Sequence, residues 1–256
     1  MFLLISLLQS LTGGGDNSLP HGGIMQVYNM IYEITRRCNV RCEHCLRGPA
    51  QKVDMSDKVI DRSLEGVEEI STITFTGGEP SLAVDRIRYI LSAVKKRGIY
   101  VDSFYIVTNG KKKSLDLCLA LMEWYAYCES NEMSSLCISK DQYHSREIES
   151  VREAELLYQG LSFYHQEERN HDINSLINEG RAKRNNIGER DAHTGIEYEL
   201  NDDESTLNYI EDVYINALGD VCPGCDLSFA SQKKLAIGSV LTESLKHIYL
   251  KQESSI

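Results

Sequence analysis

The sequence predicts an α/β protein whose parallel strands form a barrel or partial barrel. Its 256 residues are enough for one sizeable hydrophobic core with a small appendage. Segments of strand character alternate with segments of helical period, an order typical of parallel strands joined by crossover helices. Residues able to bind metals or ligands follow the predicted strands, and barrels carry their functional residues at these strand ends. Four such strand–helix units in a row favour a barrel over an open sheet.

The four units occupy the chain up to residue 158. Ser56 is the expected N-cap of the first helix, whose apolar face runs from Val59 to Ile70. The second helix carries apolar residues at helical spacing and ends at Gly98. The predicted strands are 27–35, 72–76, 104–108 and 136–139, and the last three helices are 84–97, 114–127 and 146–158.

The pattern is weaker beyond residue 159. Residues 161–164 are a candidate fifth strand, and the polar stretch 185–203 indicates a loop or an exposed hairpin. An apolar strand at 213–217 meets a Gly-Asp turn before Val221, which predicts a β-hairpin. An amphipathic segment at 244–249 closes the chain.

Three of the eight cysteines lie within eight residues, directly after the first predicted strand. Cys38, Cys42 and Cys45 have C-x3-C-x2-C spacing, which favours metal ligation in a reducing compartment over disulfides. A four-iron cluster held by three thiolates keeps one iron open for a small molecule, because closed clusters use four cysteines. The alternative is a zinc site with four ligands. His44 is a candidate fourth ligand, but its position beside Cys45 makes closure of the set difficult.

Two further motifs follow at the ends of later strands. They are Thr-Phe-Thr-Gly-Gly-Glu-Pro at 74–80 and Ile-Val-Thr-Asn-Gly at 106–110. With the cysteine loop, and in this order and spacing, they closely resemble the radical S-adenosylmethionine (radical SAM) superfamily. The resemblance is strong over 28–110 and looser elsewhere. It implies a core that is a partial (β/α)6 TIM-like barrel.

The resemblance also implies the cofactors. Cys38, Cys42 and Cys45 would hold a [4Fe-4S] cluster, and its open iron would take the amino and carboxylate groups of S-adenosylmethionine (SAM). An external electron donor such as flavodoxin or ferredoxin would reduce the cluster. Reductive cleavage of SAM would then generate a 5′-deoxyadenosyl radical, which abstracts a hydrogen atom from the substrate.

The Gly-Gly-Glu segment is the first candidate for holding SAM. Gly77 and Gly78 let the backbone approach a ligand closely, because they have no Cβ. Glu79 offers a carboxylate to the ammonium group of SAM. The structural alternative is a tight strand-to-helix turn with an exposed glutamate.

Three other residues complete the candidate SAM site. By resemblance, His44 lies against the adenine, and Ser139 contacts the methionine carboxylate or the ribose. Asn109 is expected to face the pocket. Ser139 is equally consistent with an ordinary strand-end serine, and Asn109 with an Asn-Gly turn.

The C-terminal segment resembles the shortened extension of SPASM and twitch proteins. This resemblance implies that the substrate is a peptide or protein side chain. Cys222 and Cys225 form a C-x2-C pair and are a possible auxiliary metal site, although full SPASM domains carry seven cysteines. The expected domains are a radical SAM core at 25–210 and an extension at 211–256.

Charge and targeting signals limit the partners. The formal net charge of −11, with no basic run longer than the three lysines at 111–113, argues against nucleic acid as the main partner. The apolar start of the chain lacks a basic n-region and is too short to span a bilayer. We therefore expect 1–24 to be disordered or a spurious extension, with a membrane-facing anchor as the alternative, and a cytoplasmic protein without a membrane partner.

Other functions stay open on the sequence. Within the enzyme class, these are glycyl-radical activases and enzymes that modify nucleosides or nucleotides. The alternative from a different class is a non-catalytic protein that binds metal or senses redox state through the same cysteines.

Overall fold

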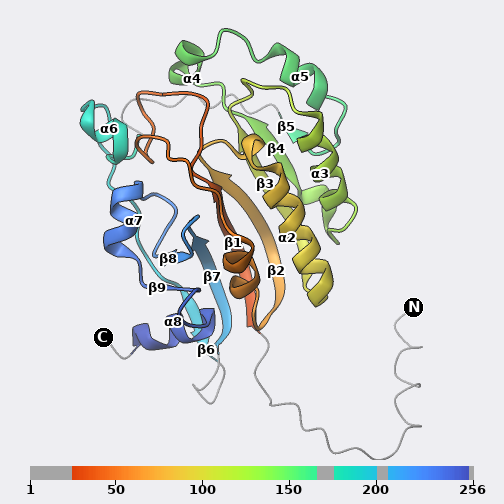
Figure 1. The fold of residues 1–256 in the computed structure, drawn as a ribbon, viewed down its shortest axis with the longest axis vertical. Coiled ribbons are helices and arrows are strands. Elements are labelled where there is room, and N and C mark those ends of the chain that lie inside the picture. Colours follow the sequence, from red (N-terminus) through yellow and green to blue (C-terminus); the bar gives the residue numbers. More distant parts are fainter. Residues whose placement is uncertain (1–24, 166–175, 201–206, 254–256) are drawn as a thin grey trace, which may run out of the picture.

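Nine strands of the described chain form one sheet, with the first strand near its centre (Figure 1). The computed structural model describes residues 25–165, 176–200 and 207–253. The strands are β1 (Met25–Thr35), β2 (Val67–Gly77), β3 (Tyr100–Thr108), β4 (Ser135–Ile138), β5 (Tyr164–His165), β6 (Tyr198–Leu200), β7 (Leu207–Ile215), β8 (Asp220–Cys222) and β9 (Gly238–Ser239). Their order is β5-β4-β3-β2-β1-β7-β8-β9, with β6 paired to β7. The predictions made for 1–24 lie outside the described residues.

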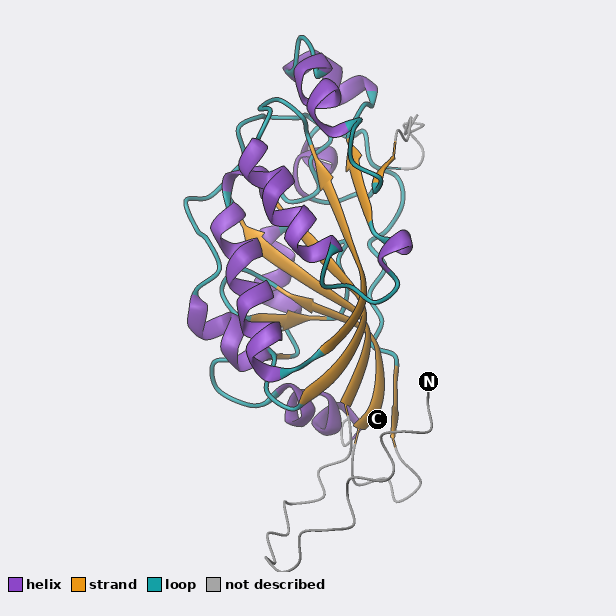
Figure 2. Cartoon of the chain, turned by 90° about the vertical axis from the view of Figure 1, so that its right-hand side faces the viewer, coloured by secondary structure: helices purple, strands orange, loops and turns teal. Residues whose placement is uncertain are grey.

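Strands β1 to β5 are parallel neighbours in chain order, as the strand–helix alternation predicts. The connections contain α1 (Asp57–Ser63), η1 (Pro80–Leu82), α2 (Val84–Arg97), α3 (Leu115–Tyr125), η2 (Asn131–Met133), α4 (Gln142–Glu147) and α5 (Arg152–Tyr158). Figure 2 shows most helices on one face of a strongly twisted sheet. The sheet ends at β5 and β9 without closing, so the predicted α/β class with a partial barrel is confirmed.

The first helix is shorter than predicted, and the following strand is longer. Ser56 does cap α1, accepting a hydrogen bond from the backbone N–H of Val59, but the helix ends at Ser63. Ile70, expected on the helical face, belongs to β2. Gly66 has a φ of 77°, and this left-handed conformation separates the helix from the strand.

The predicted helix 146–158 is two helices. Asp141 accepts hydrogen bonds from the backbone N–H groups of Tyr143 and His144, so α4 begins earlier than predicted. The chain then leaves the helix at Ile148, which is buried with Val40 in a small cluster beside the cysteine loop. Burial of this one side chain therefore separates α4 from α5 and holds α4 near the candidate site.

The C-terminal segment adds a sixth parallel strand on the far side of β1. β7 pairs with β1 in parallel, and β8 returns antiparallel, which confirms the predicted hairpin. The segment also contains α7 (Phe229–Leu235) and α8 (Leu245–Glu253), whereas α6 (Gly180–Arg184) precedes it, between β5 and β6. The expected boundary between 210 and 211 falls inside β7. The division into core and extension therefore stays a prediction, and the two parts share one sheet.

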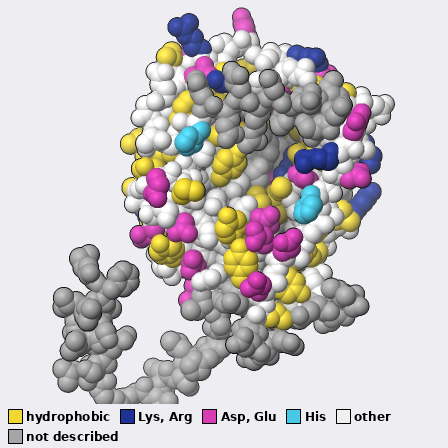
Figure 3. All heavy atoms as spheres, turned by 180° about the vertical axis from the view of Figure 1, so that it is seen from behind, with side chains coloured by type: hydrophobic (Ala, Val, Ile, Leu, Met, Phe, Trp, Pro, Cys, Tyr) yellow, Lys and Arg dark blue, Asp and Glu magenta, His cyan; other side chains and the backbone are white. Residues whose placement is uncertain are grey.

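The surface reflects the acidic composition. On the face seen in Figure 3, acidic and hydrophobic side chains are spread over the surface and gather near its lower centre, whereas lysine and arginine side chains lie toward the top and the right edge. None of the described helices is both long enough and apolar enough to cross a bilayer.

Candidate functional site

One cavity lies at the C-terminal ends of β1 to β4. Its volume is about 330 Å3, within the range of small-molecule sites. All nine residues that the sequence nominates for the cluster and for SAM line it. They are Cys38, Cys42, His44, Cys45, Gly77, Gly78, Glu79, Asn109 and Ser139. The structure therefore brings the candidate residues together, and the role of each stays a prediction.

The cysteine loop presents three free thiols to this cavity. Cys42 is buried, whereas Cys38 and Cys45 are half-buried. Burial raises the pKa of Cys42 to about 12 and also raises the pKa of Cys38. A metal that binds here must displace the thiol protons, as metal ligation by cysteine generally requires. Three thiols on one short loop, beside a cavity with room for a small molecule, fit a cluster with one open iron.

A second metal-capable group overlaps this loop. Ligand atoms of Cys42, His44 and His144 lie within 4.8 Å of one another. No sequence motif pointed to His144, which lies on α4, about one hundred positions after His44. Its Nδ1 lies 2.5 Å from Oδ2 of Asp141. Because this group contains one cysteine, it differs from the zinc set of three cysteines and His44 considered from the sequence. It keeps a metal-binding alternative open.

His44 is held by aromatic contacts. Its ring stacks on Tyr143 with a centroid distance of 4.6 Å, and its edge meets His144 at 5.0 Å. One face of His44 is therefore occupied, so an adenine could stack only on the other face. The predicted adenine contact needs that face to be open to the cavity.

The folded backbone requires glycine at positions 77 and 78. A Cβ on Gly77 would lie 2.1 Å from the carbonyl oxygen of Thr35, and one on Gly78 would lie 2.2 Å from that of Arg37. Backbone hydrogen bonds close this contact, since Gly78 donates to Thr35 at 2.8 Å. The sequence reading explained both glycines by close approach to a ligand. The structure gives a different reason, which is close packing of β2 against the start of the cysteine loop.

Glu79 is buried, in contrast to the exposed glutamate of the turn alternative. Its Oε1 accepts hydrogen bonds from the Thr108 hydroxyl at 2.5 Å and the Ser81 backbone N–H at 3.1 Å. Its Oε2 accepts from the Asn109 backbone N–H at 2.8 Å. A carboxylate has about four acceptor positions, so these donors leave Oε2 able to accept another bond, such as one from an ammonium group.

Asn109 and Ser139 occupy the ends of β3 and β4. The Asn109 side chain donates to the Asn39 side chain at 2.8 Å, and this contact ties β3 to the residue after Cys38. The Ser139 backbone N–H donates to Thr108 at 2.9 Å, which fixes the serine at the cavity wall. Asn109 thus supports the cysteine loop, a contribution separate from its predicted contact with SAM.

Helix α6 and the residue that follows it bind the cysteine loop through hydrogen bonds. The Arg181 backbone N–H donates to the Cys45 carbonyl at 2.8 Å, and its guanidinium donates to the Cys42 carbonyl at 3.2 Å. Asn185 donates to the Glu43 carbonyl at 2.8 Å. Three carbonyls of the loop are therefore held by one short helix from the second half of the chain.

Replacing Gly180 with alanine is expected to reduce the amount of cluster that the protein retains. Gly180 has a φ of 53°, and a Cβ there would lie 2.2 Å from the Leu46 carbonyl oxygen, so α6 and the cysteine loop would have to separate. Iron and sulfide per chain after anaerobic reconstitution measure this effect. Gly98→Ala is the matched control, because Gly98 also has a positive φ but nothing within 4 Å. Equal cluster content in the two variants would contradict the role of α6.

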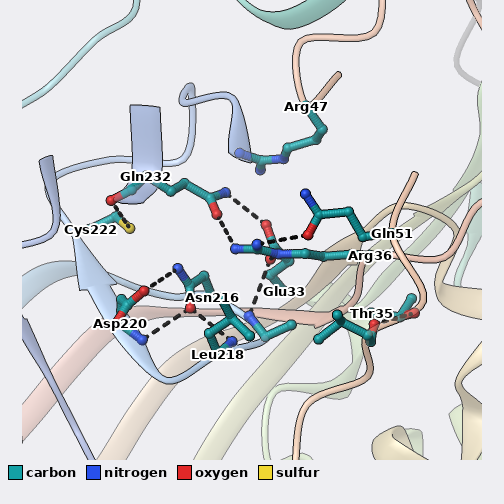
Figure 4. Close-up of polar contacts among 12 residues, drawn as sticks. Glu33, Thr35, Arg36, Arg47, Gln51, Asn216, Leu218, Asp220, Cys222 and Gln232 are labelled. Carbon is teal, nitrogen blue, oxygen red and sulfur yellow. Dashed lines mark hydrogen bonds and ion pairs between the residues drawn. The ribbon is translucent and has the colours of Figure 1, made fainter. Parts of the chain in front are cut away.

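A buried polar network joins the same loop to the C-terminal segment (Figure 4). Glu33 on β1 pairs with Arg36 at 2.7 Å, and both side chains are almost fully buried. Gln232 from α7 bonds both partners, donating to Glu33 and accepting from Arg36 at 2.7 Å each. Tyr214 from β7 donates to Glu33 at 2.8 Å. This network fixes the chain two residues before Cys38.

Arg47 is a second buried arginine, two residues after Cys45. Its guanidinium lies 5.0 Å from the Tyr214 ring and donates to the Leu227 carbonyl at 2.6 Å. Both Arg36 and Arg47 line the cavity, and the sequence had nominated neither.

The pair Cys222 and Cys225 differs in environment. Cys222 is buried with its Sγ 4.0 Å from the Gln232 carbonyl oxygen, whereas Cys225 is exposed. Within the described chain, no set of three cysteine, histidine or acidic ligand atoms gathers within 4.8 Å around this pair. An auxiliary metal site here stays a prediction, and the described residues provide no further ligands for it.

Parts of this chain are similar in sequence to known proteins. Over 85 residues it is 38% identical to the protein YfkA of Bacillus subtilis (strain 168), and the match covers 30% of this chain and 23% of that protein. The chain therefore spans under a quarter of the curated relative that it matches. Residues 32–123 match the family model described as the radical SAM superfamily.

Solved structures support the fold. The structure of anSMEcpe with bound AdoMet and the Cp18Cys peptide aligns over 89% of this chain and 82% of that one, with a TM-score of 0.57 and 12% identity. Streptococcus suis SuiB bound to S-adenosylmethionine covers 88% of this chain and 65% of its own, at 11% identity and a TM-score of 0.42. The second value is too low to carry an argument. The family match over residues 32–123 contains the three cysteines and the Gly-Gly-Glu segment, so this part of the chain is similar to the radical SAM superfamily.

Proposed function

We propose that the protein is a radical SAM enzyme that abstracts a hydrogen atom from a peptide or protein. One observation carries this proposal. The three loop cysteines and the six candidate SAM residues, which come from four separate strand ends, line a single cavity. A protein that only bound a metal would not require Glu79 and Ser139 to line the same cavity as the three cysteines.

The cysteines, Glu79 and the cavity walls would each have a separate role in the reaction. When bound, the [4Fe-4S] cluster supplies the electron that cleaves SAM reductively, which yields the hydrogen-abstracting 5′-deoxyadenosyl radical. Cys38, Cys42 and Cys45 would hold the cluster. Glu79, which accepts hydrogen bonds from three neutral donors, would bind the ammonium group of SAM. The walls of the cavity position the substrate and exclude water, which is the protein's share in such chemistry.

The substrate class and partners are further parts of the proposal. A peptide substrate is supported by the likeness in fold to anSMEcpe, whose structure contains a peptide beside AdoMet. An external donor such as flavodoxin or ferredoxin would deliver the electron. All eight cysteines are free, in keeping with a reducing, cytoplasmic location.

Anaerobic reconstitution tests the function directly. With dithionite and SAM, the wild type should release 5′-deoxyadenosine, and Cys42→Ala should lose both the cluster and the product. Cys118→Ala is the matched control, because Cys118 is also a buried cysteine but lies on α3, outside the loop. Its iron content and product should equal those of the wild type.

The outcomes separate the proposed enzyme from its alternative. A wild type that binds zinc through Cys42, His44 and His144 and takes up no iron–sulfur cluster would support the non-catalytic metal protein. A cluster that binds SAM without cleaving it, even with chemical reductant and peptide substrates, would also contradict the proposal.

A further inference from the structure

A second cavity adjoins the first on the side of the C-terminal segment. Its volume is about 730 Å3, and Arg36, Arg47, Gly48 and Phe229 line both cavities. Its charged lining residues are the basic Arg36, Arg47, Lys183, Arg184 and Lys233 and the acidic Glu179 and Asp220. A chain with a net charge of −11 thus has a basic groove that leads to its candidate site. A groove of this sign favours an anionic occupant.

Two charged residues that line the second cavity, Arg36 and Glu179, have partners within the protein. Arg36 is paired with Glu33. Glu179 accepts hydrogen bonds from the Ser231 hydroxyl at 2.9 Å and the Ser228 backbone N–H at 3.3 Å. The carboxylate that influences the pKa of Arg47 is again Glu33, whose oxygens already accept from Arg36, Tyr214 and Gln232.

Arg47 has no such partner among the described residues. Its relative exposure is 9%, and no carboxylate oxygen of the described chain lies within 4.0 Å of its guanidinium. A guanidinium has five N–H donors, and the Leu227 carbonyl uses one side of it. A buried charge without a counter-ion is costly, so this arrangement indicates a missing anion.

With the cluster in its oxidised form, the cofactors would bring no net negative charge to the site. A [4Fe-4S]2+ core with three thiolates carries one negative charge, and SAM carries one net positive charge, so together they are neutral. Four arginines line the first cavity, of which Arg36 is paired with Glu33 and Arg190 with Asp226. The charge of Glu79 then balances one of the remaining two, Arg47 and Arg181. One positive charge remains for the substrate. Arg47 is the buried one of the two, and it alone of them lines both cavities.

We propose that Arg47 binds a carboxylate of the substrate, which reaches the site along the basic groove. The substrate would be a peptide with a carboxylate near the reacting residue, either on an acidic side chain or at the chain end. A guanidinium suits this task because it can bind both carboxylate oxygens at once. This inference rests on the proposed function and specifies its substrate class.

Small peptide analogues test the inference without a known substrate. The probes are N-acetylglutamine amide, which is neutral, N-acetylglutamate amide, with a side-chain carboxylate, and N-acetylglutamine, with a terminal carboxylate. Saturation-transfer NMR would measure their binding to the reconstituted, SAM-loaded protein. We expect at least one carboxylate probe to bind about tenfold more tightly than the neutral probe, the usual size of a charged hydrogen bond. The probe that binds better identifies the source of the carboxylate.

Variants assign the preference to one residue. Arg47→Gln should abolish it, and Arg47→Lys should retain part of it through charge alone. Arg88→Gln, which removes the same charge from α2 far from the groove, should leave it unchanged. Equal binding of acidic and neutral probes by the wild type, no binding of any probe, or a preference that survives Arg47→Gln would overturn the inference. If Arg47→Gln cannot hold the cluster, the wild-type comparison and Arg47→Lys still decide the question.

The two proposals can fail separately. Release of 5′-deoxyadenosine is measured independently of the probes. A protein that cleaves SAM but shows no carboxylate preference would keep the proposed function and lose this inference. A protein that prefers carboxylates but never cleaves SAM would lose the proposed function.

Discussion

Replacing Glu33 with alanine is expected to lower the free energy of unfolding by about 3–5 kcal/mol, the usual cost of removing one partner of a buried ion pair. The change would leave the Arg36 guanidinium buried without its carboxylate. It would also remove the acceptor of Tyr214, Gln232 and the Ala217 backbone N–H. Burial raises the pKa of Tyr214 well above its usual value, so this phenol stays protonated and needs an acceptor. Urea unfolding followed by circular dichroism measures the loss.

The pair Arg62 and Glu65 provides a matched control. It has the same three-residue spacing as Glu33 and Arg36 and a separation of 2.6 Å, but Glu65 is exposed and Arg62 is only half-buried. Glu65→Ala should therefore cost less than about 1 kcal/mol, as is typical of surface pairs. Similar losses in Glu33→Ala and Glu65→Ala would show that the buried network contributes little. Because the network holds the chain before Cys38, Glu33→Ala should also retain less cluster than Glu65→Ala.

Replacing Gly78 with alanine should weaken SAM binding by roughly tenfold or more, since shifts of about 1 Å in a site have effects of this size or larger. The new Cβ would lie 2.2 Å from the Arg37 carbonyl oxygen and 2.7 Å from its carbonyl carbon. These are backbone atoms, so β2 and the cysteine loop must move apart. The overpacking should also cost about 1–3 kcal/mol of unfolding free energy. Equilibrium binding of SAM to the reconstituted protein gives the main readout.

Gly160→Ala separates this clash from the general effect of removing a glycine. Neither Gly78 nor Gly160 has a positive φ, but a Cβ on Gly160 would meet nothing within 4 Å. We expect Gly160→Ala to bind SAM as the wild type does. Wild-type SAM affinity in Gly78→Ala would mean that the loop tolerates the displacement, and the packing argument would then be wrong.

The placement of the candidate site could be predicted because it depends on local patterns and one general rule. Strand character before Cys38, Gly77, Asn109 and Ser139 puts each of them at the carboxyl end of a strand. Parallel strands bring these ends to one edge of the sheet, so the residues converge without any knowledge of long-range contacts. The same local signals located the caps at Ser56 and Gly98.

Element boundaries were less accurate where tertiary contacts compete with periodicity. Ile70 fits a helical face by its spacing, but it lies in β2, beyond the break at Gly66. Ile148 fits the period of a continuing helix, yet its burial beside Val40 ends α4. In each case the spacing of apolar residues fits a helix, but packing in the folded protein places the residue outside one.

The sequence by itself determined the α/β class, the cysteine loop and the set of residues that line the candidate site. Only the tertiary structure decided that β7 lies beside β1 and that Arg36, Arg47 and His144 join the site. The physical reason is separation along the chain. Tyr214 and Glu33 are 181 positions apart, and their contact depends on which edge of β1 accepts the last parallel strand. No local period or turn signal carries that choice, because it is made by the packing of whole strands and by the burial of the charges between them.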